Sequence, residues 1–136
     1  MTEDELIAFI GGLDGVEVVV ASADNGAPES SWGDVFCSVA GRRFPFATIV
    51  KRDQPGFDES SRLDRDEVFR LNIAIGREAL RARFDAGAEH DPAVPDRLFP
   101  HPVYAAQGWV SVLNPSAETA DEVRDLLQAA HTRAVS

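Results

Sequence analysis

The chain has 136 residues, 44% of them hydrophobic, and its 13 basic and 23 acidic residues give a net charge of −10. A chain of this length can bury a core without disulfides or metal, so we expect one domain over residues 1–136. The negative charge argues against nucleic acids and anionic membranes as partners, since both attract basic surfaces.

Cys37 is the only cysteine, so no disulfide can form within the chain and nothing indicates an oxidising compartment. Residues 1–5 are acidic, whereas a secretory signal begins with basic and then apolar residues. No apolar run reaches the roughly 18–20 residues that a membrane span needs. We therefore expect a cytoplasmic protein, and the single lysine among many arginines and alanines is typical of a GC-rich bacterial genome.

The first half of the chain predicts one helix and three strands. Thr2 and Glu5 form a capping-box pattern, and the apolar spacing behind it predicts a helix that ends at Gly11 and Gly12. A β-branched run at Val16–Val20 predicts the first strand. Alternation from Gly33 to about residue 40, a turn at 41–43 and an apolar run at 44–50 predict the next two strands as a hairpin.

The second half contains two long connections. Residues 51–66 carry charges, proline and glycine without periodicity, and a loop of that length is expected to be functional, mobile or both. Residues 87–102 form a proline-bearing link. The patterns predict the remaining elements as a strand at 68–75, a helix from 77 to about 86, a strand at 108–113 and a helix from 117 to about 133.

This gives the order α-β-β-β-β-α-β-α. Consecutive strands joined by short turns indicate an antiparallel sheet of about five strands, and each amphipathic helix needs a surface against which to bury its apolar stripe. The economical solution is an α+β two-layer sandwich with the helices packed on one face of the sheet.

The segment from Pro100 to Tyr104 is the first candidate for a functional site. Half of the eight prolines lie at 92–102, so this path is extended and held in place. His101 stands between two of them, and an imidazole there can exchange a proton near neutral pH. The alternative is a loop histidine that bonds backbone groups and helps the prolines hold the turn.

Two tryptophans open strands, Trp32 before Asp34 and Trp109 at the start of the last strand. Each can be a core or sheet-edge aromatic. If both lie at the same end of the sheet, they can instead wall a pocket with Asp34 as its polar group. The residues expected to line a pocket are therefore Trp32, Asp34, His101, Tyr104 and Trp109.

No catalytic or cofactor signature accompanies these residues. His90, Asp91 and His101 match no zinc spacing, and Cys37 inside a strand is expected to be a small core residue. Neither a glycine-rich phosphate loop nor a Ser-His-Asp arrangement is visible, so we expect no metal and no cofactor. The charges of the 51–66 loop can bind an anion or close over a cleft, or they can pair with one another in solvent.

Several segments carry a family resemblance. The run at 69–78, the proline-rich link, the Gly-Trp-Val-Ser-Val strand at 108–112 and the closing helix resemble the MmcQ/YjbR family. The segments at 32–34, 45–50, 69–73, 100–104 and 108–115 are similar to a family of uncharacterised bacterial proteins of about this length. The resemblance implies a CyaY-like α+β fold and no established activity.

DNA binding has been suggested for MmcQ/YjbR members, but the resemblance is weakest where that role would lie. Members tend to have Asn-Lys-x-His before the tryptophan, whereas this chain has Ala-Ala-Gln-Gly at 105–108. Our leading hypothesis is a non-enzymatic domain that binds a ligand or a protein partner. The alternatives are an enzyme that uses His101 as acid or base with Asp34 or Asp53 nearby, and nucleic-acid binding by analogy. Sequence alone gives neither the ligand nor the oligomeric state.

Overall fold

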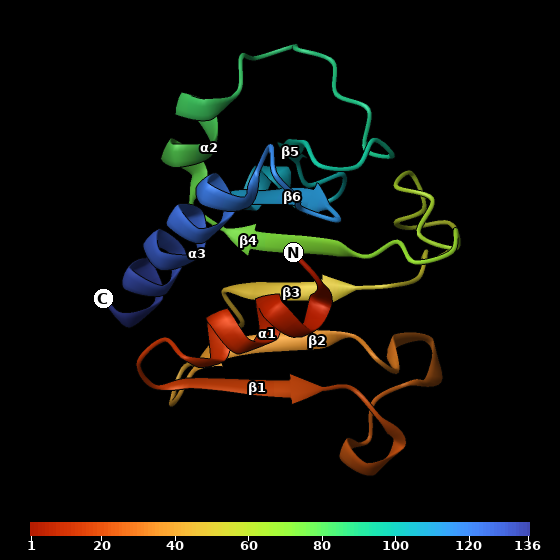
Figure 1. Ribbon diagram of the computed structural model, residues 1–136, viewed down its shortest axis with the longest axis vertical. Helices are drawn as coiled ribbons and strands as arrows, with labels where there is room; N and C mark the ends of the chain where they lie inside the picture. Colours follow the sequence, from red (N-terminus) through yellow and green to blue (C-terminus); the bar gives the residue numbers. More distant parts are fainter.

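The computed structural model describes residues 1–136 and shows one antiparallel sheet of six strands with three helices packed against it (Figure 1). The strands lie in the order β1-β2-β3-β4-β6-β5. This confirms the predicted α+β class. The helices are α1 (Glu3–Gly11), α2 (Arg77–Arg83) and α3 (Ala120–Val135); the strands are β1 (Val16–Val20), β2 (Val35–Val39), β3 (Ala47–Val50), β4 (Arg70–Ala74), β5 (Leu98–Pro100) and β6 (Trp109–Leu113).

The helix ends follow local chemistry. Thr2 and Glu5 form the predicted capping box at α1, with each side chain accepting the other's backbone N–H at 3.1 Å. In α3 the apolar stripe contains the buried Val123, Leu127 and Ala130. None of the three helices has the length and apolar character needed to cross a membrane.

All three helices contribute to a core on one face of the sheet, and α1 and α3 lie in front of that face in Figure 1. Successive residues of a strand point to opposite faces, so Leu71 and Ile73 of β4 enter this core while Arg70 and Asn72 point away from it. The buried core consists of Leu6, Ile10, Val35, Cys37, Phe46, Ala47, Ile49, Leu71, Ile73, Ile75, Leu80, Val110, Val112, Val123, Leu127 and Ala130.

The opposite face carries a continuous row of side chains across all six strands. The register aligns one residue from each strand directly beside the next, in the order Val19, Phe36, Thr48, Asn72, Ser111 and Phe99. The row begins apolar and exposed on β1 and becomes polar and buried at β4 and β6. We call this side of the sheet the helix-free face.

The sequence prediction missed one strand and misplaced several ends. The proline-bearing link contains β5, because a proline can end a short edge strand whose outer side needs no ladder bond. Helix α2 stops at Arg83, earlier than predicted, since Phe84 is already extended. Helix α3 begins at Ala120 and not at 117, because Asp96 accepts hydrogen bonds from the backbone and hydroxyl groups just before it.

Candidate functional site

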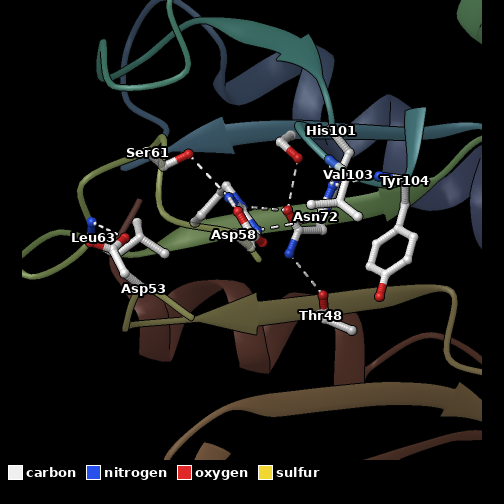
Figure 2. A network of polar contacts seen from close by, with 11 residues as sticks. Thr48, Asp53, Asp58, Ser61, Leu63, Asn72, His101, Val103 and Tyr104 are labelled. Atoms are coloured by element: carbon white, nitrogen blue, oxygen red, sulfur yellow. Dashed lines mark hydrogen bonds and ion pairs between the residues drawn. The ribbon is translucent and has the colours of Figure 1, made fainter. Parts of the chain in front are cut away.

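Five of the seven buried polar side chains belong to one hydrogen-bonded cluster on the helix-free face. Figure 2 shows this cluster in front of β3, β4 and β6, with the helices behind the sheet. A protein interior accepts polar groups when their hydrogen bonds are satisfied, so such a collection needs a connected network. We call it the polar cluster; its members are Thr48, Asp58, Ser61, Arg70, Asn72, His101 and Ser111.

Arg70 is the centre of the polar cluster and is only 1% exposed. Its two terminal nitrogens bind both carboxylate oxygens of Asp58 at 3.0 and 2.5 Å, which is the bidentate geometry that suits a guanidinium. It also donates to Ser61 Oγ at 3.1 Å. Burial alone would raise the pKa of Asp58, but the hydrogen bond and charge of Arg70 outweigh it and lower that pKa.

Asn72 connects three strands through its amide. Its Oδ1 accepts from Arg70 Nε at 2.9 Å and from the Ser111 hydroxyl of β6 at 2.8 Å. Its Nδ2 donates to Thr48 Oγ1 of β3 at 3.0 Å. The amide is therefore bonded on both ends, and its orientation is fixed by its neighbours.

His101 enters the cluster from the connection between β5 and β6. Its Nδ1 lies 3.0 Å from the backbone nitrogens of both Val103 and Tyr104, so it must accept their N–H groups and cannot carry a proton. The neutral ring therefore has its proton on Nε2. That nitrogen lies 3.4 Å from Arg70 Nη2, so two donors face each other in the interior.

Electrostatics reinforce the neutral state of His101, which is 4% exposed. Burial, followed by the nearby Arg70 charge, lowers its pKa to about 4, and the Asp58 charge opposes these two effects only in part. A ring of this kind donates a hydrogen bond from Nε2 at pH 7, whereas an effective general base has a pKa near the working pH. The geometry thus favours a hydrogen-bond donor over a proton acceptor.

Two exposed aromatic rings lie beside the polar cluster. Tyr104 contacts the His101 ring with centroids 5.0 Å apart, and Phe57 meets Tyr104 edge-on at 6.1 Å. The two rings are 42% and 58% exposed, respectively. In Figure 2 the Tyr104 side chain extends from the His101 connection across β4 toward β3. Apolar rings next to oriented polar groups are the usual composition of a ligand site.

Three of the five predicted pocket residues lie together. The His101 N–H donates to the Trp109 carbonyl at 3.0 Å, and the Trp109 N–H donates to the Tyr104 carbonyl at 3.3 Å. Trp32 lies apart from them, outside the strand, where its indole N–H donates to the Ala27 carbonyl at 2.9 Å. The register places the start of β2 level with Val112, near the end of β6, whereas Trp109 opens β6. The two tryptophans therefore lie toward opposite ends of the sheet.

Asp34 is buried at the start of β2, and its Oδ1 has no hydrogen-bond partner. Its pKa is raised to about 6, because the effect of burial exceeds the opposing effects of the Lys51 N–H and of the charges of Arg52, Lys51 and Arg70. His101 makes no hydrogen bond to Asp34. Asp53, the other expected carboxylate partner, instead accepts the backbone N–H of Leu63 at 2.8 Å. The carboxylate associated with His101 is Asp58, on the far side of the Arg70 guanidinium.

Sequence reasoning missed most of the polar cluster. The available signal was the alternation in β4, which puts the polar residues Arg70 and Asn72 on the face away from the apolar residues of the same strand. Asp58 and Ser61 gave no such signal, because they come from the aperiodic 51–66 loop. That loop is held by its own polar contacts, including Arg65 with the carbonyls of Ser61 and Ala93.

A family model matches residues 1–136, which is the whole chain. The chain belongs to DUF6194, a family of unknown function. No curated protein matches the DUF6194 chain at a significant level. The family match shows no link to MmcQ/YjbR, so no role of that family is assigned to the polar cluster.

Proposed function

We propose that this chain is a non-enzymatic binding domain whose site is the border between the polar cluster and the Phe57 and Tyr104 rings. The observation that carries the proposal is the pair of facing donors, His101 Nε2–H and Arg70 Nη2. Arg70 Nη2 gives one of its two N–H groups to Asp58, whereas the His101 Nε2–H faces only Arg70. One acceptor oxygen within reach of both nitrogens would bind the His101 N–H and the second Arg70 N–H together, and a buried donor without an acceptor is costly.

The charges favour an uncharged ligand. Arg70 is already neutralised by a bidentate carboxylate, and His101 is neutral, so the site has no spare positive charge. The net charge of −10 also repels anions at long range. A carbonyl or amide oxygen therefore fits better than a carboxylate or phosphate. The adjoining rings favour a planar apolar group on the same molecule, since aromatic faces stack well on such groups.

The proposal requires that the buried donors become accessible beside the two aromatic side chains. Phe57 and Tyr104 are exposed and contact each other edge-on, and exposed side chains change rotamer rapidly. The acid–base alternative has less support, because the lowered pKa and the bonded Nδ1 of His101 suit a donor.

The test is a thermal-shift screen with aromatic amides and ketones set against the matching carboxylates. We expect members of the first group to raise the melting temperature and the carboxylates to do so less. His101→Asn is the informative variant, because an asparagine Oδ1 can still accept the Val103 and Tyr104 N–H groups while the Nε2 donor is lost.

The shift should disappear in His101→Asn and diminish in Tyr104→Ala. Phe44→Ala is the matched control, since Phe44 is an exposed aromatic in the β2–β3 connection, away from the cluster. A compound that stabilises the wild type and His101→Asn equally would show that the facing donors are not the site. A screen in which carboxylates alone bind would refute the preference for an uncharged ligand.

A further inference from the structure

The two edges of the sheet differ in how well they are protected from pairing. β5 is three residues long and ends in Pro100, and both features discourage a further strand. β1 forms the other edge, visible at the border of the sheet in Figure 1, and its sequence Val-Glu-Val-Val-Val contains no proline, lysine or arginine. Val19 and Val20 on it are 47% and 50% exposed. β1 is therefore the edge that can accept another strand.

The register identifies the free backbone groups of β1. On the β2 side, the Gly15 carbonyl accepts the N–H of Ala40, and the Ala21 N–H donates to the carbonyl of Asp34. Hydrogen-bonded and non-hydrogen-bonded pairs alternate along an antiparallel ladder. The backbone N–H and C=O groups of the odd-numbered residues of β1 therefore point toward β2, and those of the even-numbered residues point outward. The outward groups are the N–H and C=O of Val16, Val18 and Val20.

Two of these six groups are already bonded within the chain. The Val16 N–H donates to the Leu13 carbonyl at 3.3 Å, and the Val20 carbonyl accepts from Asn25 Nδ2 at 2.8 Å. Four groups remain, namely the Val16 C=O, the Val18 N–H and C=O, and the Val20 N–H. This set is symmetric about Val18.

We propose that β1 pairs with β1 of a second copy of this chain, about a two-fold axis at Val18. Val18 then exchanges two hydrogen bonds with its counterpart, and each Val20 N–H donates to the Val16 carbonyl of the other copy. The only bond missing from an ideal ladder would join the Val16 N–H to a Val20 carbonyl. Both of those groups are satisfied internally, so the symmetric pair leaves nothing unpaired.

The complementarity between the free backbone groups of two β1 strands favours a second copy over a strand of another protein. A foreign strand that spans all of β1 would place a free acceptor opposite the Val16 N–H and a free donor opposite the Val20 carbonyl, and neither would find a partner on β1. Other self-pairing registers also leave groups unsatisfied. The symmetric pair buries Val20 against Val16 of the other copy and joins the two sheets into one.

The association is expected to be weak, because a five-residue edge buries little area and each copy carries a charge of −10. Sedimentation equilibrium at protein concentrations from about 10 μM to about 1 mM detects dimers with dissociation constants in that range. We expect the mass to rise toward twice the 14.8 kDa of the chain, and to do so at lower concentration when salt is added. A dimer that weakens with salt would be held by charge and would overturn the proposal.

Val20→Pro tests the edge directly, because it removes an outward N–H and leaves the ladder to β2 intact. Val20→Thr keeps the N–H and the β-branched shape, and serves as the control. We expect Val20→Pro to remain a monomer and Val20→Thr to dimerise like the wild type. Dimerisation of folded Val20→Pro at wild-type strength would overturn the proposal, as would a wild type that stays monomeric at all concentrations.

Hydrogen exchange on the wild type gives a result that does not depend on any variant. The amides of Val18 and Val20 should become protected as protein concentration rises, while the Val19 amide, which faces β2, should be protected throughout. If protection at Val18 does not change with concentration, the edge is not the contact. Protection that appears only on addition of another protein would assign the edge to a foreign strand and contradict self-pairing.

Discussion

Gly108 and Gly76 pack backbone against backbone where β6 begins and β4 leads into α2. A Cβ added at Gly108 would lie 2.4 Å from the Gly76 carbonyl carbon and 2.6 Å from the Arg77 nitrogen. Gly108 also has a φ of +88°. Its carbonyl accepts the N–H groups of Ile75 and Gly76, both at 3.0 Å, so the close approach joins the strand that carries Arg70 to the connection that carries His101.

Gly108→Ala should therefore be strongly destabilising. Since backbone atoms cannot move aside as a flexible side chain can, we expect a loss of roughly 3 kcal/mol or more in the free energy of unfolding. Gly41→Ala is the control, because Gly41 has a φ of +83° with no atom within 4 Å of its added Cβ. It should cost only about 1–2 kcal/mol from the backbone conformation. Equal losses in urea denaturation would show that the contact with Gly76 is unimportant.

Asp58→Asn should cost about 3–5 kcal/mol, because it leaves the buried Arg70 charge without its counter-ion. Replacing both partners, as Arg70→Met with Asp58→Leu, should restore much of this stability, since an apolar pair needs no counter-ion. Asp121→Asn provides the isosteric control at the exposed pair with Arg124 and should change stability by less than about 1 kcal/mol. Chemical denaturation of the wild type and the three variants gives the free energy of unfolding of each. A double variant no more stable than Asp58→Asn would contradict the expected cost of an unpaired Arg70 charge.

The fold was largely predictable from sequence, whereas the site was not. Helix and strand periodicity depends on neighbours in the chain, so the capping box at Thr2 and the apolar alternation around Leu71 were informative by themselves. The polar cluster depends on contacts between distant segments. Asp58 meets Arg70 across 12 positions, and Ser111 meets Asn72 across 39. No local pattern encodes such pairs, and β5 was hidden for the related reason that its pairing with β6 overrides the prolines around it.

The lowered pKa of His101 predicts how stability depends on pH. Its folded pKa of about 4 is below the ordinary value of 6.5, so between these two values the unfolded chain binds the extra proton. The stabilisation is complete above pH 6.5 and is lost as pH falls to 4, which amounts to about 3 kcal/mol. His101→Asn removes the titrating group. The stability difference between wild type and variant should therefore be larger at neutral pH than at acidic pH, and a constant difference in urea titrations would argue against burial as the cause.

The pH dependence of stability that comes from Asp34 should be opposite to that from His101, and Asp34→Asn tests it. Burial raises the pKa of Asp34 to about 6 from 3.8, so the folded chain holds the proton more tightly and the carboxyl is favourable only while protonated. This stabilisation is fully present below the lower value and is lost as pH rises through 6. Above pH 6 the wild type carries an ionised carboxylate whose Oδ1 has no partner. The neutral amide avoids that cost, so the variant should be more stable by roughly 3 kcal/mol.

Near pH 4 the wild type and Asp34→Asn should be similar in stability, because the wild-type side chain is then largely protonated as well. Asp24→Asn is the matched control, since Asp24 is exposed and the same chemical change there should alter stability little at either pH. Urea denaturation at pH 4 and pH 8 would separate the cases. If Asp34→Asn destabilises the protein at pH 8, then the carboxylate makes a favourable contact in its charged form and burial is not the dominant effect on it.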